Sequence, residues 1–319
     1  MSKKIWLIAA AILVASGLLI GVVAMSLLAW DFKMLSNSKT VHNEHEIKDD
    51  FTSIFIDTNT ANLKISPTDG ETRVVCDEWD NMYHEVFVEN GVLKIEFRDE
   101  RRLGEKIGIG FGSGKVSVYL PKHEYDKLFI DHSTGDIEIV SGVSFKRIDA
   151  KLSTGDLYCA SSVSEHANFE ASTGKITIEN STYGSLDIKT TTGDVSLKSV
   201  EALGDLRLYC STGDSELENV KCKSFISEAG TGTLTMKNLV AENKMDIERS
   251  TGDIKLDSCD AAEIEIETET GSVSGTLKTG KIFITESDTG KIKVPASSDG
   301  GRCVIETDTG DIKIEIAKD

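Results

Sequence analysis

Five glutamates recur every 19 or 20 residues in the C-terminal third of this chain: Glu228, Glu248, Glu267, Glu286 and Glu306. Carboxylates held side by side repel one another unless a cation or a cationic partner screens them. Carboxylate oxygens are also the ligands that hard divalent cations prefer. One hypothesis is that this column, called the acidic strip below, binds divalent cations or a cationic envelope component. We favour the alternative, a charged solvent face that keeps the protein soluble, and assign no firm metal site.

A second acidic column follows a repeated Thr-Gly pair. Aspartate comes directly after the glycine at Asp136, Asp156, Asp194, Asp214, Asp253 and Asp311. Stacked aspartates suggest a calcium ladder, but Lys175 and Lys291 occupy the same position in other units. The nonapeptide spacing of calcium-binding β-rolls is also absent. We interpret this column as a solvated turn.

Other motifs give little support to catalysis. The run GIGFGSGK, with Gly108, Gly110, Gly112 and Gly114, fails both the Walker spacing and GxGxxG. His42 and His45 are weak metal candidates in a polar segment, and no histidine lies in HExxH. The many carboxylates leave a paired-acid glycosidase or a solenoid lyase open, yet aromatic residues, which grip sugars, make up only 6%. We expect no enzyme activity and no cofactor, with a carbohydrate-active or carbohydrate-binding solenoid as the alternative.

The Thr-Gly pair itself recurs across the C-terminal two-thirds of the chain, every 19 or 20 residues. Such a period is typical of a repeat architecture. Its glycines are Gly135, Gly155, Gly174, Gly193, Gly213, Gly232, Gly252, Gly271, Gly290 and Gly310.

Each repeat predicts two short strands that meet at the glycine. Apolar residues stand two and four positions after it, as at Ile176 and Ile178, and seven and five positions before it, as at Leu186 and Ile188. This alternation indicates strands with one buried face. An antiparallel meander would need a sheet of about twenty strands, far beyond the usual size. We therefore favour a β-solenoid of about ten coils, which buries every apolar row.

The six cysteines contain no CxxC pair and no metal-site spacing. Cys159, Cys210, Cys259 and Cys303 fall in apolar positions of the repeat, and no two of them share a column on adjacent coils. We interpret these four as small core residues rather than disulfide partners. The pattern assigns no role to Cys76 and Cys222.

The N-terminus predicts a membrane anchor. Lys3 and Lys4 precede an uncharged run over residues 5–30, long enough to cross a bilayer of about 30 Å. Because these lysines lie on the short N-terminal side of the run, we expect residues 1–4 in the cytoplasm and the residues after the run outside the cell membrane. A cleaved signal peptide is the alternative, but its apolar region is shorter. Gly17 and Gly21 form a GxxxG motif that we ascribe to chance among small residues.

Residues 31–47 are expected to be a linker, residues 48–126 a β-strand cap and residues 127–319 the solenoid. Within the cap, Asn90-Gly91 between two apolar segments indicates a hairpin.

The net charge of −18 opposes nucleic-acid binding, which needs a basic surface.

Three elements together resemble a known family: the alternating entry Ser53-Ile54-Phe55-Ile56, the segment Val116-Ser117-Val118-Tyr119-Leu120-Pro121, and the repeated Ser-Thr-Gly-Asp units. They are similar to the bacterial putative-adhesin family of β-strand-repeat surface proteins, also called toastrack domains, over residues 48–319. The resemblance implies an extracytoplasmic β-solenoid, often membrane-linked and sometimes tied to envelope stress responses, and it brings no catalytic residues. We expect a single-pass membrane protein that binds an envelope protein or polysaccharide.

Overall fold

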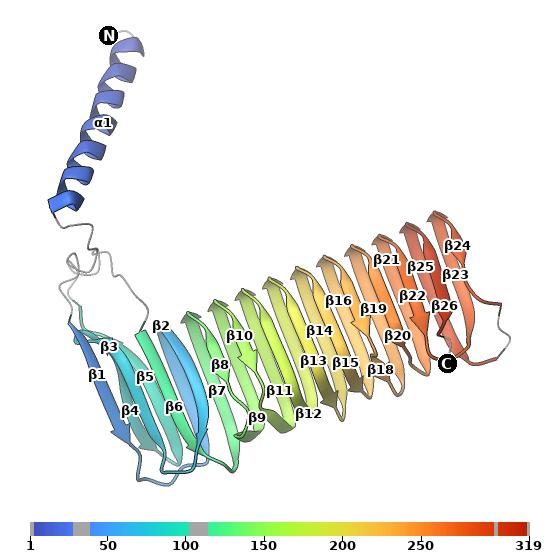
Figure 1. The fold of residues 1–319 in the computed structure, drawn as a ribbon, viewed down its shortest axis with the longest axis horizontal. Helices are drawn as coiled ribbons and strands as arrows, with labels where there is room; N and C mark the ends of the chain where they lie inside the picture. Colours follow the sequence, from blue (N-terminus) through green and yellow to red (C-terminus); the bar gives the residue numbers. More distant parts are fainter. Residues whose placement is uncertain (1–2, 28–38, 102–113, 297–298, 318–319) are drawn as a thin grey trace.

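The computed structural model describes residues 3–27, 39–101, 114–296 and 299–317, and its strands form one long β-solenoid (Figure 1). Helix α1 spans Lys3–Leu27. The first strands are β1 (Thr40–Glu46), β2 (Ser53–Thr68), β3 (Arg73–Trp79), β4 (Met82–Glu89), β5 (Val92–Asp99) and β6 (Gly114–Pro121). They are followed by β7 (Glu124–Thr134), β8 (Ile137–Ile139), β9 (Ser144–Thr154), β10 (Leu157–Cys159), β11 (Ser162–Thr173) and β12 (Ile176–Thr192).

The middle and the end of the rod are built from shorter strands. These are β13 (Val195–Ala202), β14 (Asp205–Thr212), β15 (Ser215–Cys222), β16 (Ser224–Thr231), β17 (Leu234–Lys237), β18 (Val240–Ala241) and β19 (Lys244–Thr251). The last are β20 (Ile254–Cys259), β21 (Glu263–Thr270), β22 (Val273–Leu277), β23 (Lys281–Thr289), β24 (Ile292–Lys293), β25 (Gly301–Thr309) and β26 (Ile312–Ile316).

The strands line two faces of the rod. The first face holds the segments that precede a Thr-Gly corner, and the second face holds those that follow one; β12 contributes to both. Neighbouring coils pair in parallel and in register, so that Ile176 lies between Leu157 and Val195. The predicted all-β solenoid is therefore confirmed.

The core runs along the interior between the two faces. Ile176, Ile178, Leu186 and Ile188 are all fully buried, and they belong to one continuous cluster that extends from Ile54 to Ile314. The six cysteines are also buried and unpaired, which confirms the core role predicted for four of them. Burial raises the pKa of the Cys222 and Cys303 thiols to about 12, so these thiols stay protonated at neutral pH in the absence of a metal ion.

The corner glycines are required by the stacking itself. Gly174 has a φ of 133°, and a Cβ atom placed on it would lie 1.8 Å from the carbonyl oxygen of Gly155 in the preceding coil. The next coil repeats the contact between Gly193 and Gly174. Any side chain at these positions would push neighbouring coils apart.

The aspartate column ties consecutive coils together. Asp156 Oδ1 accepts the backbone N–H of Lys175 at 2.8 Å, and Asp214 Oδ1 accepts that of Thr233 at 2.8 Å. This side-chain ladder gives the column a structural role, which the sequence interpretation as a solvated turn did not include.

A second kind of corner lies six residues after the glycine. Five residues there have left-handed backbone angles, with φ between 50° and 55°: Asn180, Ser199, Asn219, Asn238 and Ser258. Asparagine tolerates this conformation better than most residues, and Asn238 Nδ2 donates to Asn219 Oδ1 at 3.0 Å.

The N-terminal end departs from the expected organisation in two ways. Residues 40–46, which were predicted to be part of a linker, form β1 and pair antiparallel with β3. Strand β2, predicted to belong to a separate cap, is inserted as a coil between β5 and β6 on one side and β7 and β8 on the other. Parallel stacking thus begins inside residues 48–126. The hairpin at Asn90-Gly91 is confirmed, since β4 pairs with β5 and both turn residues have positive φ.

The C-terminal coils do not stack in chain order. Strand β25 lies between β21 and β23, and β26 lies between β22 and β24. The coil formed by β23 and β24 therefore ends the rod (Figure 1). Ile292, expected in the core, is 44% exposed there because no further coil covers it.

The expected membrane span is not found. Among the residues that the structure describes, no helix has both the length and the apolar character needed to cross a bilayer. Of the glycine run in GIGFGSGK, Gly108, Gly110 and Gly112 lie outside the described residues, and Gly114 begins β6.

Candidate binding groove beside the acidic strip

The structure aligns the acidic strip on the outer side of the first face. Its members come from β16, β19, β21, β25 and β23, and all five side chains are exposed. Strand register places them in the spatial order Glu228, Glu248, Glu267, Glu306 and Glu286. The prediction of one outward row holds, although the swapped last coil exchanges the final two members.

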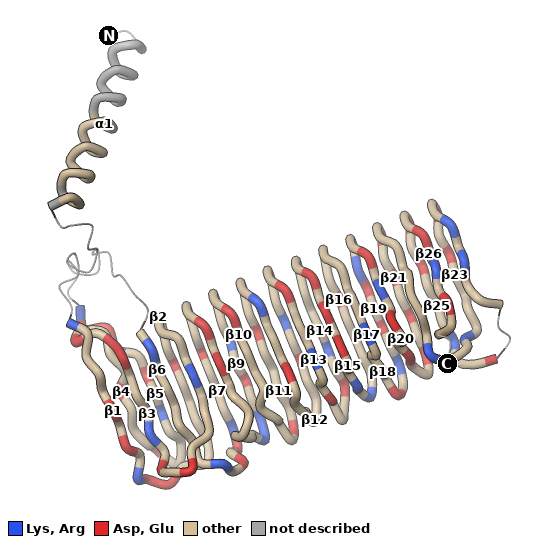
Figure 2. Tube along the Cα trace, viewed as in Figure 1, with Lys and Arg blue, Asp and Glu red and all other residues tan. Residues whose placement is uncertain are grey.

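The same row is charge-balanced in the N-terminal half of the rod. There it reads Asp131, Lys151, Glu170 and Lys189 from coil to coil, and Lys151 Nζ lies 3.9 Å from Glu170 Oε2. Figure 2 shows charges of both signs along the whole rod. Within the described part of the chain, no member of the acidic strip makes an ion pair, so the strip is a row of like charges that a ligand can neutralise.

A shallow groove of about 440 Å³ opens next to the acidic strip. Glu228, Glu248 and Glu267 of the strip line it together with Glu269. Lys189 and the buried Arg249 supply the positive charges.

Arg249 is the most unusual residue of the groove. Its side chain points inward from β19 and the residue is only 3% exposed. Nη2 donates to Ser227 Oγ at 3.0 Å, whereas Nε and Nη1 have no hydrogen-bond partner among the described residues. Burial lowers the pKa of this guanidinium, which nearby Cys210 and Asp214 only partly offset. Buried guanidinium nitrogens without hydrogen-bond partners are costly, and an anionic group in the groove would satisfy Nε and Nη1.

The groove lies where one coil carries smaller residues than the coils on either side of it. At the turn of β16 the chain carries Ala229 and Gly230, while the matching positions of the next coil carry Arg249 and Ser250. A Cβ atom on Gly230 would lie 2.7 Å from the carbonyl oxygen of Ser211. These two small residues leave the space into which Arg249 extends.

This arrangement can hold a ligand that carries both signs of charge. An ammonium group fits the carboxylates of the acidic strip, and a carboxylate or phosphate fits the free N–H groups of Arg249. Sequence reasoning found the glutamates but missed Arg249. The available signal was an arginine in an inward position that other repeats fill with Leu152, Ala171 or Thr190.

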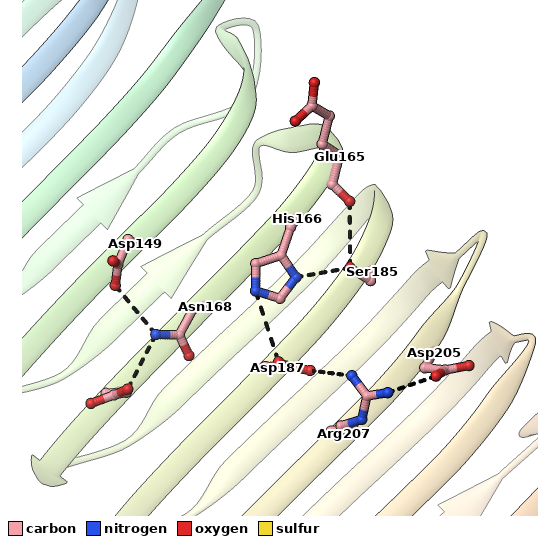
Figure 3. Close-up of polar contacts among 9 residues, drawn as sticks. Asp149, Glu165, His166, Asn168, Ser185, Asp187, Asp205 and Arg207 are labelled. Carbon is pink, nitrogen blue, oxygen red and sulfur yellow. Dashed lines mark hydrogen bonds and ion pairs between the residues drawn. The ribbon is translucent and has the colours of Figure 1, made fainter.

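The polar residues farther along the first face contrast with the groove, because they are internally satisfied (Figure 3). Arg207 donates to Asp205 at 2.7 Å and contacts Asp187 at 3.5 Å. His166 Nδ1 lies 2.8 Å from Ser185 Oγ, and Nε2 of the same ring lies 3.8 Å from Asp187 Oδ2. Such a network has few open positions for a ligand.

The two histidines considered as metal ligands are not brought together. His42 is exposed and its Nδ1 lies 2.7 Å from Asp77 Oδ1. His45 points to the other side of β1, where its Nε2 is buried without a hydrogen-bond partner among the described residues.

A family profile described as Toastrack DUF4097 matches residues 51–208 and 201–319, which together cover most of the chain and all of its coils. The chain belongs to the Toastrack DUF4097 family. No curated protein sequence matches the chain.

Solved structures with similarity to this Toastrack chain include a putative adhesin from Parabacteroides distasonis ATCC 8503. It has 12% sequence identity and a TM-score of 0.54, over 75% of this chain and 98% of that one. A putative adhesin from Bacteroides fragilis NCTC 9343 has 16% identity and a TM-score of 0.45, over 87% of this chain and 97% of that one. At such identities, the first similarity supports the Toastrack fold alone.

Proposed function

We propose that this protein is a non-catalytic, adhesin-like binding module of the bacterial cell envelope. Its ligand is an envelope polymer or protein that presents an ammonium group close to a carboxylate or phosphate. The observation that carries this proposal is the groove in which two guanidinium nitrogens of Arg249 without hydrogen-bond partners among the described residues lie beside glutamates of the acidic strip that make no ion pair.

The charges of the groove favour an organic ligand over a bare metal ion. A divalent cation held by Glu228 and Glu248 would lie near the positive charge of Arg249, which weakens its binding. A zwitterionic ligand uses both signs and satisfies the guanidinium at the same time. The ligand probe of the experiment below is therefore a peptide with lysine next to a free carboxyl terminus.

Isothermal titration of the full-length protein with this peptide tests the proposal. Arg249→Met removes the buried charge but keeps much of the side-chain volume. Because hydrogen bonds between charged groups contribute about 1.5–3 kcal/mol, we expect this variant to bind at least about tenfold more weakly. The triple variant E228Q/E248Q/E267Q should lose a similar amount of binding affinity for the peptide.

A matched control distinguishes an effect of the groove charges from an effect of the net charge of the protein. The variant E124Q/E201Q/E242Q changes the same number of charges at exposed sites that do not line the groove, and its affinity should equal that of the wild type. Equal loss in both triple variants would show that the groove has no special role. Heat and a rise in melting temperature with calcium alone, abolished in E228Q/E248Q/E267Q, would instead favour a cation site.

We also propose that the chain associates with the cell membrane through its N-terminal segment, with the solenoid outside the cytoplasm. The uncharged run over residues 5–30 behind Lys3 and Lys4 supports this, as do the exposed apolar side chains of α1, such as Leu13 and Leu19. Cell fractionation compares the full chain with a chain that begins at residue 39. Recovery of both in the soluble cytoplasmic fraction would reject the membrane location.

A further inference from the structure

The N-terminal end of the rod contains a buried group of three chemically different ligand atoms. Cys76 and Glu78 lie two residues apart on β3 and point into the interior, and His84 faces them from β4. The thiol sulfur, a carboxylate oxygen and a ring nitrogen all lie within 4.8 Å of one another. Each of the three residues is at most 4% exposed.

The surrounding hydrogen bonds fix the carboxylate and one side of the histidine ring. Glu78 Oε1 accepts from Asn43 Nδ2 at 2.8 Å, and Glu78 Oε2 accepts the backbone N–H of His84 at 2.8 Å. His84 Nδ1 lies 2.8 Å from the same oxygen. The other ring nitrogen, His84 Nε2, is buried without any hydrogen-bond partner among the described residues.

We propose that Cys76, Glu78 and His84 form a binding site for a borderline transition-metal ion, Zn²⁺ in the first place. A thiolate, an imidazole and a carboxylate are the three side-chain types that bind zinc in proteins. Tetrahedral zinc takes four ligands, so three protein groups leave one position for a water molecule. The site lies far along the chain from the groove around Arg249 and does not depend on the proposed function.

The location gives the metal a mechanical role. Strands β3 and β4 pair only at Trp79 and Met82, and beyond that turn β3 joins β6 while β4 joins β5. The two strands therefore diverge onto opposite faces at the N-terminal end of the solenoid, where β1 pairs with the outer edge of β3. An ion held by Cys76 and His84 would join the diverging strands and close this end of the rod.

Cobalt substitution tests the site directly. The full-length protein is freed of metal with a chelator and titrated with Co²⁺, whose thiolate complexes give a charge-transfer band in the near ultraviolet. We expect one equivalent of Co²⁺ to produce this band, Zn²⁺ to remove it by competition, and Zn²⁺ to raise the melting temperature. No band, or a band that needs far more than one equivalent, would overturn the proposal.

Variants assign the band to these residues. Cys76→Ser should abolish it, whereas Cys222→Ser, which changes another buried thiol, should keep it. Circular dichroism checks that each variant folds. If Cys76→Ser does not fold, His84→Gln keeps the thiol and should bind Co²⁺ at least tenfold more weakly. Wild-type affinity in His84→Gln, or an unchanged band in a folded Cys76→Ser protein, would place the metal elsewhere and refute the site.

Discussion

Single residues of this solenoid carry constraints that come from their neighbours in the adjacent coils rather than from their own strand. The column at the second corner shows this, because three of its five left-handed positions hold asparagine and two hold serine. Left-handed backbone angles raise the conformational energy of a non-glycine residue, and they raise it less for asparagine than for serine. The column therefore contains positions at which the present residue is not the most stable choice.

Ser199→Asn should increase stability. Ser199 has a φ of 54°, is exposed, and belongs to the coil between those of Asn180 and Asn219. We expect a gain of about 0.5 kcal/mol in the free energy of unfolding, from better backbone compatibility and a side-chain bond to the asparagine ladder. Denaturant unfolding measures it. Ser196→Asn, three residues earlier in the same strand β13 and without left-handed angles, is the control and should give no gain. A loss of stability in Ser199→Asn would contradict the argument.

His132 makes stability depend on pH. It is 1% exposed, and burial lowers its pKa more than nearby Asp136 and Asp131 raise it. The unfolded chain therefore binds more protons below the ordinary histidine pKa of about 6.5, and stability falls as the pH drops through that value, by at most about 1.4 kcal/mol per unit. Thr58 contacts the ring at Nδ1.

This effect can be checked in the wild type and in the variant Thr58→Val/His132→Leu. The free energy of unfolding of both proteins is measured from about pH 7.5 down to about pH 5.5. The leucine copies Leu152, which follows in the same inward row. The slope of stability against pH should be shallower in the variant, whereas His123→Gln, at an exposed site, should keep the wild-type slope. The same slope in all three proteins would show that His132 does not contribute.

At the scale of the strand and its corner, much of the structure was predictable. The alternation around Gly174 and Gly193 is local information, so the strands, their inward residues and the corner followed directly from the sequence. The acidic strip was predictable for the same reason, because a fixed period places equivalent residues in one row. The role of Arg249 was not predictable, since it depends on the small size of Ala229 and Gly230 in the neighbouring coil.

Gly174→Ala should be strongly destabilising, because the new methyl group would meet the carbonyl oxygen of Gly155 at 1.8 Å with a φ of 133°. We expect a loss of at least about 2 kcal/mol in the free energy of unfolding, since strained angles alone cost about 1–3 kcal/mol. Gly70→Ala is the matched control. The φ of Gly70 lies outside the left-handed region, and a Cβ atom there would meet only Thr68 Oγ1, at an ordinary contact distance of 3.6 Å. The melting temperature of Gly70→Ala should therefore be nearly unchanged. Similar effects at both sites would mean that corner stacking is not the reason for the glycines.

At the scale of the whole molecule, the order of coils could not be predicted, because the repeat makes their stacking surfaces interchangeable. Parallel strands of similar apolar pattern can pair with either neighbour, so nothing local says that β25 inserts between β21 and β23. The same holds for β2 at the other end. Chain order is a reliable guide only where the connection between coils is too short to skip one, as in the middle of this rod.

Hydrogen exchange can test the swapped order. Strands β23 and β24 lie at the end of the stack and have Ile282, Ile284 and Ile292 exposed, whereas β25 and β26 lie between two coils. Exposed terminal coils open with little free energy, and internal coils need more of the rod to open. Amides of residues 281–293 should therefore exchange faster than those of residues 301–316, although the latter come later in the chain. Coils stacked in chain order would give the opposite ranking, and mass spectrometry of peptides from these two segments distinguishes the two.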